Sequence, residues 1–204
     1  MFIAFAAFLL VLTVPLAGGN LAALGRMQLN RSSLLFIALA LQVLITDIVA
    51  SGPRALLVAI HLFTYALAGV FLWANRRVPG LLLIALGAAM NAVTIALNHG
   101  TLPASARALR AAGIAERPGD FTNSGVIRHA VLRPLGDIMA TPSWLPFRNV
   151  ISIGDLIALL GTAVLLHHVC NSRLARAGSA LVQRWRTEVE APAPSALPEP
   201  VPVA

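Results

Sequence analysis

Long apolar runs, separated by short polar turns, constrain the fold of this chain more than any other feature of its sequence. A helix that crosses the hydrocarbon layer of a bilayer needs about 20 mostly apolar residues, and five runs approach or reach that length. Charged residues make up 11% of the chain, far less than in an ordinary soluble domain. We therefore expect an all-α integral membrane bundle of five spanning helices. The expected spans are 1–17, 34–50, 55–74, 78–97 and 150–169, which form a membrane domain over 1–171.

The first apolar run has two interpretations, a spanning helix or a secretory leader. A leader begins with a basic region, whereas this chain continues from Met1 directly to the apolar Phe2. The pair Gly18-Gly19 would suit a cleavage region, so removal of the run stays open as the alternative. We expect the run to be retained as a short first span.

The arginines between the runs predict the orientation in the membrane. All 15 basic residues are Arg, and basic residues next to spans favour the cytoplasmic side. The arginines after the first, third and fifth spans fall on one side of a five-span bundle; they are Arg26, Arg31, Arg76, Arg77 and Arg173. The large loop also carries arginines, but long loops count less in this rule. We expect a multi-pass protein of the bacterial inner membrane, with its N-terminus outside and its C-terminus in the cytoplasm.

The large loop, 99–149, is therefore expected on the extracytoplasmic side. Ala104–Ala112 is typical of a short helix, with Gly113 as its stop signal. The mixed apolar stretch Val126–Ala140 predicts a second short helix at the membrane surface. Thr141–Phe147 contains two prolines and is expected to be irregular.

The segment after the last span divides into two parts. Residues 172–190 place Leu174, Leu181 and Trp185 on one helical face with arginines elsewhere, the pattern of a cytoplasmic amphipathic helix that lies in the interface. Residues 191–204 alternate Pro with Ala, Val and Leu and are expected to be a disordered tail.

A stripe of polar residues runs along the fourth predicted span. Asn91, Thr94 and Asn98 follow one another at i, i+3 and i+7, so they share a helical face, and Gly87 lies one turn earlier on the same face. Unsatisfied amides are costly in hydrocarbon, so this face should meet other helices. The stripe is the feature around which we place the rest of the bundle.

Further polar residues are expected at the depth of this stripe, near the outer ends of their spans. Ionisable groups inside a membrane are expensive and indicate a functional site by default. We expect an outward-facing binding pocket, roofed by the large loop and lined by Asn91, Thr94, Asn98, His99, His61, Asp47, Asp155 and Asp137. Structural roles are the alternative: the aspartates could cap helices, and His61 and Asn91 could hydrogen-bond across helix pairs.

Three classes of function follow from this pocket. The first is the binding or transport of a small polar solute, a cation or a lipid headgroup. The second is a membrane enzyme that uses Asp and His at the outer leaflet, and the third is an assembly subunit whose Asn stripe packs against a partner protein. We lean away from an enzyme because no catalytic residue is identifiable; Ser143 lacks a nucleophile motif and Cys170 lies at the opposite end from the Asp/His group.

Cofactors, metals and nucleic acid are not indicated by the sequence. The +7 formal charge is better explained by topology and by anionic lipid headgroups at the cytoplasmic face than by nucleic acid. The single cysteine excludes an internal disulfide, and no His, Asp or Cys spacing predicts a metal site. The expected partners are the lipid bilayer, a small polar ligand and a membrane protein.

Several short motifs in the second half resemble a known family. They are Asn91, Asn98-His99-Gly100-Thr101-Leu102-Pro103, Ala108-Leu109-Arg110-Ala111-Ala112-Gly113, Leu135-Gly136-Asp137-Ile138 and Ser152-Ile153-Gly154-Asp155-Leu156. In this order they resemble small bacterial polytopic membrane proteins catalogued as a domain of unknown function, which have an Asn-Gly-Gly-x-Met-Pro signature after the fourth span. Here His99 replaces the first Gly of that signature and Leu102 replaces the Met. The resemblance, over Pro79 to Gly161, implies a multi-span helical fold at the membrane and assigns no activity.

Overall fold

The computed structural model describes residues 2–49, 52–115, 124–142, 144–145 and 147–190, and the described chain is mostly helical. The helices are α1 (Phe2–Leu16), α2 (Ala22–Gly25), α3 (Ser32–Val43), α4 (Arg54–Ala74), α5 (Leu81–Leu97), α6 (Ala106–Ala112), α7 (Ile153–Val169) and α8 (Arg173–Glu190). A π-helical turn, Leu44–Ile48, continues α3, and a 3₁₀ turn covers Arg133–Leu135. The strands are β1 (Leu102–Pro103), β2 (Ser124–Gly125), β3 (Met139–Ala140) and β4 (Val150–Ile151). The tail expected at 191–204 lies outside the described residues.

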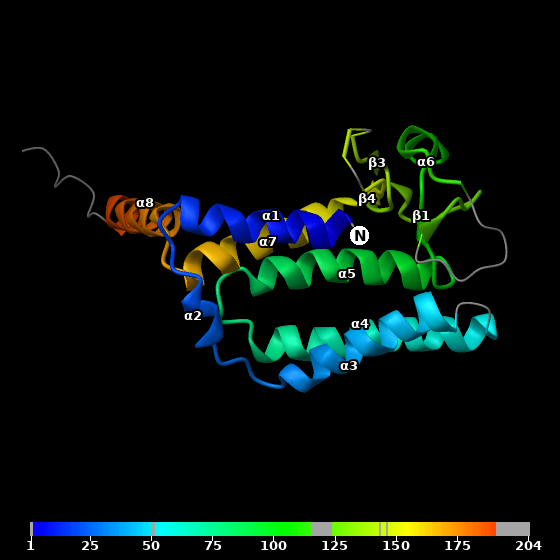
Figure 1. Cartoon of the computed structure of the whole chain (residues 1–204), viewed down its shortest axis with the longest axis horizontal. Helices are drawn as coiled ribbons and strands as arrows, with labels where there is room; N and C mark the ends of the chain where they lie inside the picture. Colours follow the sequence, from blue (N-terminus) through cyan, green and yellow to red (C-terminus); the bar gives the residue numbers. More distant parts are fainter. Residues whose placement is uncertain (1, 50–51, 116–123, 143, 146, 191–204) are drawn as a thin grey trace, which may run out of the picture.

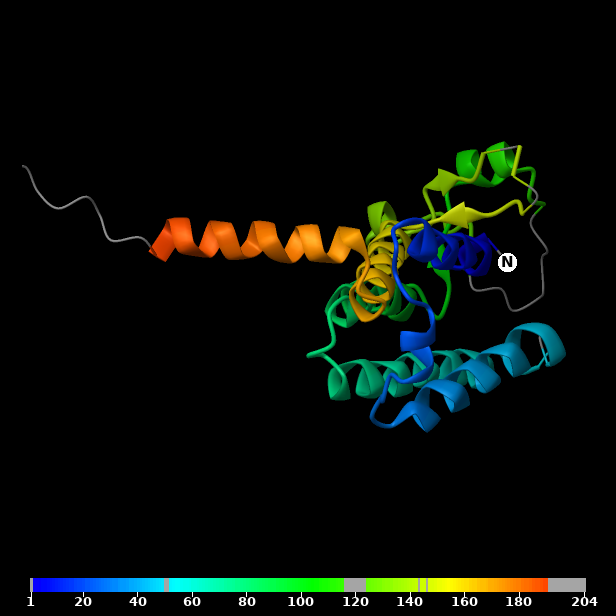
Figure 2. The ribbon, with the colours of Figure 1, turned by 60° about the vertical axis from the view of Figure 1, so that its left-hand side comes forward.

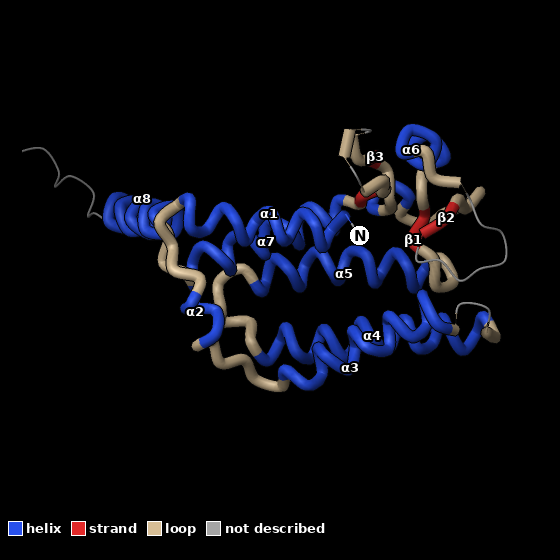
Figure 3. The backbone as a smooth tube through the Cα atoms, in the orientation of Figure 1, coloured by secondary structure: helices blue, strands red, loops and turns tan. Residues whose placement is uncertain are grey.

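The five helices of the bundle lie side by side, as Figure 1 shows, and each packs on its neighbour in the order α1, α7, α5, α4, α3. The strands and α6 form a cap at the end where α1 begins, and Figure 3 shows every strand gathered there. At the opposite end α8 leaves the bundle at 95° to α7 and projects away from it (Figure 2).

Glycine pairs bring α5 and α7 into the closest helix contact of the bundle. Gly80 faces Gly161, and seven residues further along α5, Gly87 faces Gly154. A Cβ on Gly161 would lie 2.7 Å from the carbonyl oxygen of Gly80, and one on Gly154 would lie 2.7 Å from that of Gly87. Because real Cβ atoms do not approach backbone this closely, any side chain at these positions would force the helices apart. Small residues at such crossings are the usual means by which helices associate in membranes.

The first helix is joined to the last part of the bundle by polar contacts. Thr13 Oγ1 lies 3.0 Å from His167 Nε2, and the other ring nitrogen of His167 lies 2.9 Å from Ser172 Oγ. The backbone N–H of Asn20 donates to the carbonyl of Cys170 at 2.9 Å. These contacts fix the turn after α1 against the junction of α7 and α8.

The cap is a small folded unit with its own core. Strands β1 and β2 pair in parallel, β3 and β4 pair antiparallel, and Ala104 forms a parallel bridge with Asp137. Below them α6 contributes three buried side chains to a cluster made of Ala104, Ala108, Leu109, Ala112 and Val150. The helix expected at 104–112 is thus confirmed, with Ser105 as its N-cap and Gly113 (φ 64°) ending it.

The second helix expected in the loop, over Val126–Ala140, is wrong. That stretch holds a short 3₁₀ turn and strand β3, and some of its backbone groups bond to other segments. The N–H of Asp137 donates to Pro103 O at 2.8 Å, so this residue extends the β1–β2 pairing. A Cβ on Gly136 would overlap the carbonyl oxygen of Pro103, which explains why a glycine stands at this crossing.

The mostly helical fold is as expected, but the expected five full-length spans are not supported. Among the described helices, α4 alone is long and apolar enough to cross a membrane. There are two candidates if α7 and α8 are taken as one bent span. The helices α1, α3 and α5 are apolar but shorter than 18 residues. One reason is visible at Gly80, whose left-handed backbone (φ 91°) starts α5 three residues later than the expected Val78.

Candidate functional site

Asn91, in the middle of the predicted stripe, joins α5 to the start of α7. Its Nδ2 donates to Asp155 Oδ1 at 2.9 Å, and its Oδ1 accepts from Ser152 Oγ at 3.0 Å. The side chain is 8% exposed, so both bonds form away from solvent. A Cβ on Gly154 would overlap Asn91 Oδ1, so the glycine gives the amide its space.

Asp155 also closes the N-terminus of α7. The Ser152 hydroxyl accepts from the N–H of Asp155 at 3.0 Å, and Asp155 Oδ2 accepts from the N–H of Ser152 at 3.0 Å, which together make a capping box. Both oxygens of this carboxylate therefore have donors, one from the backbone N–H of Ser152 and one from the Asn91 amide. The alternative that Asp155 caps a helix agrees with this geometry.

The other two residues of the stripe also hydrogen-bond within the protein. Thr94 is fully buried and donates to Met90 O at 2.8 Å. Asn98 donates to Thr94 O at 2.7 Å and to Val131 O at 2.8 Å, and its Oδ1 accepts from the N–H of Val131 at 2.9 Å. Asn98 thus attaches the cap to the end of α5.

The backbone conformation of the turn after α5 accounts for residues of the motif Asn98–Pro103. His99 is exposed with a left-handed backbone (φ 55°), and Gly100 follows at φ 89°. A Cβ on Gly100 would also overlap the side chain of Val58, so this glycine meets two requirements at once. The buried Thr101 accepts a 3.0 Å hydrogen bond from Arg54 at the start of α4. His99 itself points to no other site residue in these contacts.

Asp137 is the most unusual polar residue of the site. It is 5% exposed, and its Oδ1 is buried without a hydrogen-bond partner among the described residues. Burial raises the pKa of Asp137 to about 7; a hydrogen bond from Ser124 opposes this shift, and the negative charge of Asp155 adds to it. A carboxyl group in this state takes up a proton or a cation near neutral pH.

Tyr65 of α4 completes this group, and the sequence did not single it out as a site residue. It lies within electrostatic reach of both Asp155 and Asp137. Its ring makes an edge contact with His61, with the ring centroids 5.4 Å apart. The available signal was its position one turn after His61 on the same face.

His61 faces α3 as well as Tyr65. Its Nδ1 lies 3.0 Å from Gln42 Oε1, and Thr64 donates to the same oxygen at 3.0 Å. This is the hydrogen bonding across a helix pair given above as the alternative for His61. The side chain of Asp47 lies outside the described residues.

Three of the predicted residues therefore converge under the cap, namely Asn91, Asp155 and Asp137, together with Ser152, Ser124 and Tyr65. Thr94 and Asn98 lie beside them on α5 but bond elsewhere. Within the described ranges no group of three His, Cys, Asp or Glu residues could hold a metal ion. The arrangement offers a pair of carboxyl groups with hydroxyl and amide neighbours, chemistry suited to a proton or a singly charged cation.

Comparison with known families identifies the chain's relatives. The model of a family of unknown function, DUF5317, matches residues 26–167. This chain belongs to that family. The match contains all eight predicted site residues and leaves out all of α1 and all of α8. The family of unknown function inferred from the motifs is thereby confirmed.

One curated relative of this DUF5317 protein is an uncharacterized protein of Thermotoga maritima. It is 30% identical over 96 residues, which are 46% of this chain and 54% of the relative. The match thus spans about half the length of that protein. No solved structure matches the chain.

Proposed function

We propose that this DUF5317 protein is a multi-pass membrane protein that binds a small cation at Asp137, beneath a cap on the outer face of the membrane. The observation that carries the proposal is the buried Asp137 Oδ1, which has no hydrogen-bond partner among the described residues. A buried carboxyl oxygen without a donor is costly, and functional sites are where such groups are kept.

The placement in a membrane is supported by the outer surface of the bundle. Large apolar side chains are exposed on all five long helices, among them Phe8, Phe36, Phe63, Leu82 and Leu160. Water would disfavour so much exposed apolar surface, whereas lipid would cover it. We propose that all five helices span; a 17-residue helix is about 25 Å long, and local thinning of the bilayer accommodates the difference from about 30 Å.

The orientation is supported by the two ends of the bundle. The cap lies beside the start of α1, where Phe5 and Phe147 have ring centroids 5.2 Å apart. Arg31 and Arg76 lie at the other end, beside the junction with α8. Because arginines next to spans favour the cytoplasm, the cap and the N-terminus are placed outside.

The choice of a cation follows from the charges around Asp137. Asp155 and Tyr65 lie within electrostatic reach of this carboxyl, and neither brings a positive charge to it. Two carboxyl groups close together share a proton or attract a positive ligand. We propose that the proton competes with this ligand, so that binding strengthens as the pH rises through about 7.

The test is thermal unfolding of the detergent-solubilised protein with sodium, potassium, calcium or choline chloride at pH 6 and pH 8. At least one cation should raise Tm, by more at pH 8 than at pH 6, and Asp137→Asn should abolish the shift. Glu188→Gln, on the exposed face of α8, serves as the matched control. A Tm that responds to no cation, or an Asp137→Asn variant that responds like the natural protein, would refute the proposal.

The assembly alternative receives less support, because the amide that motivated it is already paired. Asn91 bonds to Ser152 and Asp155 within the chain, so both ends of its amide already have a partner inside the protein. The enzyme alternative needs His close to Asp, and the exposed His99 lies in no contact with Asp137 or Asp155 that the structure shows.

A further inference from the structure

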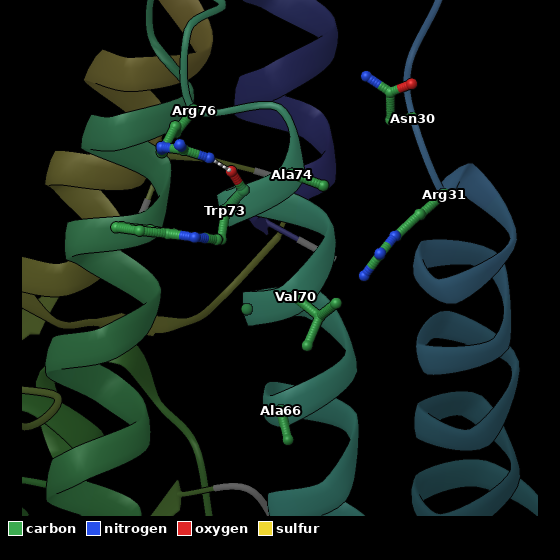
Figure 4. A pocket seen from close by; sticks show the side chains of 8 residues that line it. Asn30, Arg31, Ala66, Val70, Trp73, Ala74 and Arg76 are labelled. Atoms are coloured by element: carbon green, nitrogen blue, oxygen red, sulfur yellow. Dashed lines mark hydrogen bonds between the residues drawn. The ribbon is translucent and has the colours of Figure 1, made fainter.

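A second hollow lies at the opposite end of the bundle from the cap. It has a volume of about 760 Å³ and opens between the start of α3 and the last turns of α4. Figure 4 shows several of its lining residues: Arg31 projects from the start of α3 toward α4, while Arg76 and Trp73 lie together on the side of α4 that faces away from α3. The lining residues are Asn30, Arg31, Ala66, Gly69, Val70, Trp73, Ala74 and Arg76.

The mouth of this hollow is strongly basic. Arg31 and Arg76 are both exposed, and Arg76 lies 4.5 Å from the centre of the Trp73 ring while it donates to Trp73 O at 2.9 Å. In the first 115 residues of the chain the sole acidic residue is Asp47, which belongs to the other end of the α3 segment. The two guanidinium groups therefore suit an anion, and Arg is the side chain best suited to phosphate.

The hollow continues into an apolar groove between α4 and α5. Ala66 and Gly69 line both, and the groove has a volume of about 460 Å³. Its walls are mainly small side chains: Leu62, Tyr65, Ala66, Gly69 and Leu72 from α4, and Ala85, Ala88, Ala89, Ala92, Val93 and Ala96 from α5. A charged mouth joined to an apolar trough fits an amphipathic molecule better than a free anion.

The length of this trough matches one half of a bilayer. From Trp73 to Leu62 the helix advances about 16 Å at 1.5 Å per residue, and half of the hydrocarbon layer is about 15 Å. Trp73 is 66% exposed at the basic end, where an indole ring marks the membrane interface. An acyl chain whose headgroup lies beside Trp73 would therefore end near Leu62.

We propose that one anionic phospholipid of the cytoplasmic leaflet occupies this site. Its phosphate lies at the mouth of the hollow that Arg31 and Arg76 line, and one acyl chain follows the groove between α4 and α5. The inference uses the membrane placement proposed above but is independent of cation binding at Asp137. A partner helix is a poorer occupant, because it would bring apolar side chains against the two arginines.

The experiment measures lipid retention and thermal stability of the full chain purified in mild detergent. Native mass spectrometry after mixing with phosphatidylglycerol should show one bound lipid, and equal amounts of phosphatidylcholine should be retained far less. Phosphatidylglycerol should also raise Tm. The variant Arg31→Gln with Arg76→Gln should reduce retention about tenfold or more, as expected for two arginines near an anionic headgroup.

Two control pairs separate this site from general attraction. Arg26→Gln with Arg77→Gln removes two exposed arginines at the same end that do not line the hollow, and retention should change less than twofold. Ala89→Phe fills the groove from an exposed position and should reduce retention, whereas Leu86→Phe, exposed but outside the groove, should not.

Three results would overturn the proposal. Equal losses from the two arginine pairs would indicate diffuse attraction to the surface. Normal retention in Ala89→Phe would indicate a headgroup site without an acyl groove. A dimer in the natural protein that Ala89→Phe dissociates would identify a second copy as the occupant. If the double arginine variant does not fold, the single variants Arg31→Gln and Arg76→Gln, each tested for phosphatidylglycerol against phosphatidylcholine, decide the question.

Discussion

Replacing Asn91 by Leu tests the junction between α5 and α7 directly. Leu has nearly the shape of Asn, so the change removes two hydrogen bonds without opening a large cavity. Interhelical hydrogen bonds in membranes contribute about 0.6 kcal/mol on average and up to about 1.7 kcal/mol, and the bond to Asp155 should lie at the upper end. Ser152 is fully buried, so its hydroxyl would lose its acceptor at a cost of about 1 kcal/mol. The expected loss of unfolding free energy is about 3 kcal/mol.

The assay is equilibrium unfolding by SDS titration in mixed micelles, extrapolated to zero SDS. Ser152→Ala should cost about 1 kcal/mol less in the Asn91→Leu background than alone, since the hydroxyl then has no acceptor to lose. Thr162→Val is the control, because Thr162 donates only to Ala158 O within α7 and its loss should cost less than about 0.5 kcal/mol. A loss below about 0.5 kcal/mol for Asn91→Leu, or additive effects with Ser152→Ala, would refute the reasoning.

Three further predictions concern the cap, the glycine pairs and the topology. The pKa of Asp137 is raised from 3.8 to about 7, so the folded protein keeps a proton that the unfolded chain has already lost between these values. The contribution of Asp137 to the free energy of unfolding is therefore fully present below about pH 4, and on the order of 4 kcal/mol of it is lost as the pH rises to about 7. Asp137→Asn should remove this pH dependence, which is measured as the free energy of unfolding from about pH 4 to about pH 8. Gly87→Ala should lower Tm clearly because its Cβ would overlap Gly154, whereas Gly178→Ala in α8, with nothing within 4 Å, should not lower it; equal effects would contradict the pairing. In a Cys170→Ala background, single cysteines Ala111→Cys and Ser179→Cys, both at exposed positions, should be labelled from outside and inside the cell respectively, and labelling from one face would contradict the orientation.

Much of the helical architecture could be predicted from apolar runs and their breakers. The bounds of α4 and α7 differ from the expected 55–74 and 150–169 by at most three residues, since Pro53 and Ser152 mark where helical backbone begins. Apolarity alone did not give the length of each helix. The π-helical turn at Leu44–Ile48 and the left-handed Gly80 depend on contacts with neighbouring helices, which no local pattern records.

The burial of the polar stripe could be predicted from the sequence, but its hydrogen-bond partners could not. The spacing of Asn91, Thr94 and Asn98 correctly indicated one buried face, because that face requires polar partners in any bundle. The partners themselves come from 33 and 64 residues away in the chain, at Val131 and Asp155, and periodicity cannot identify them. The cap was harder still, since two-residue strands have no periodicity, and the mixed pattern of Val126–Ala140 fitted a surface helix equally well.

The paired glycines and Asn91 have a consequence for how the protein is made. The 55 residues from Asn98 to Ser152 separate α5 from the helix that covers it. At about 5–20 residues per second, α7 follows α5 out of the ribosome after about 3–11 s. Throughout that interval the Asn91 amide has no partner from α7, and an unpaired amide in hydrocarbon costs several kcal/mol. In the five-span arrangement proposed above, release of α5 into lipid is therefore unfavourable until synthesis reaches Asp155, and the insertion machinery would have to retain this helix while the cap is translocated.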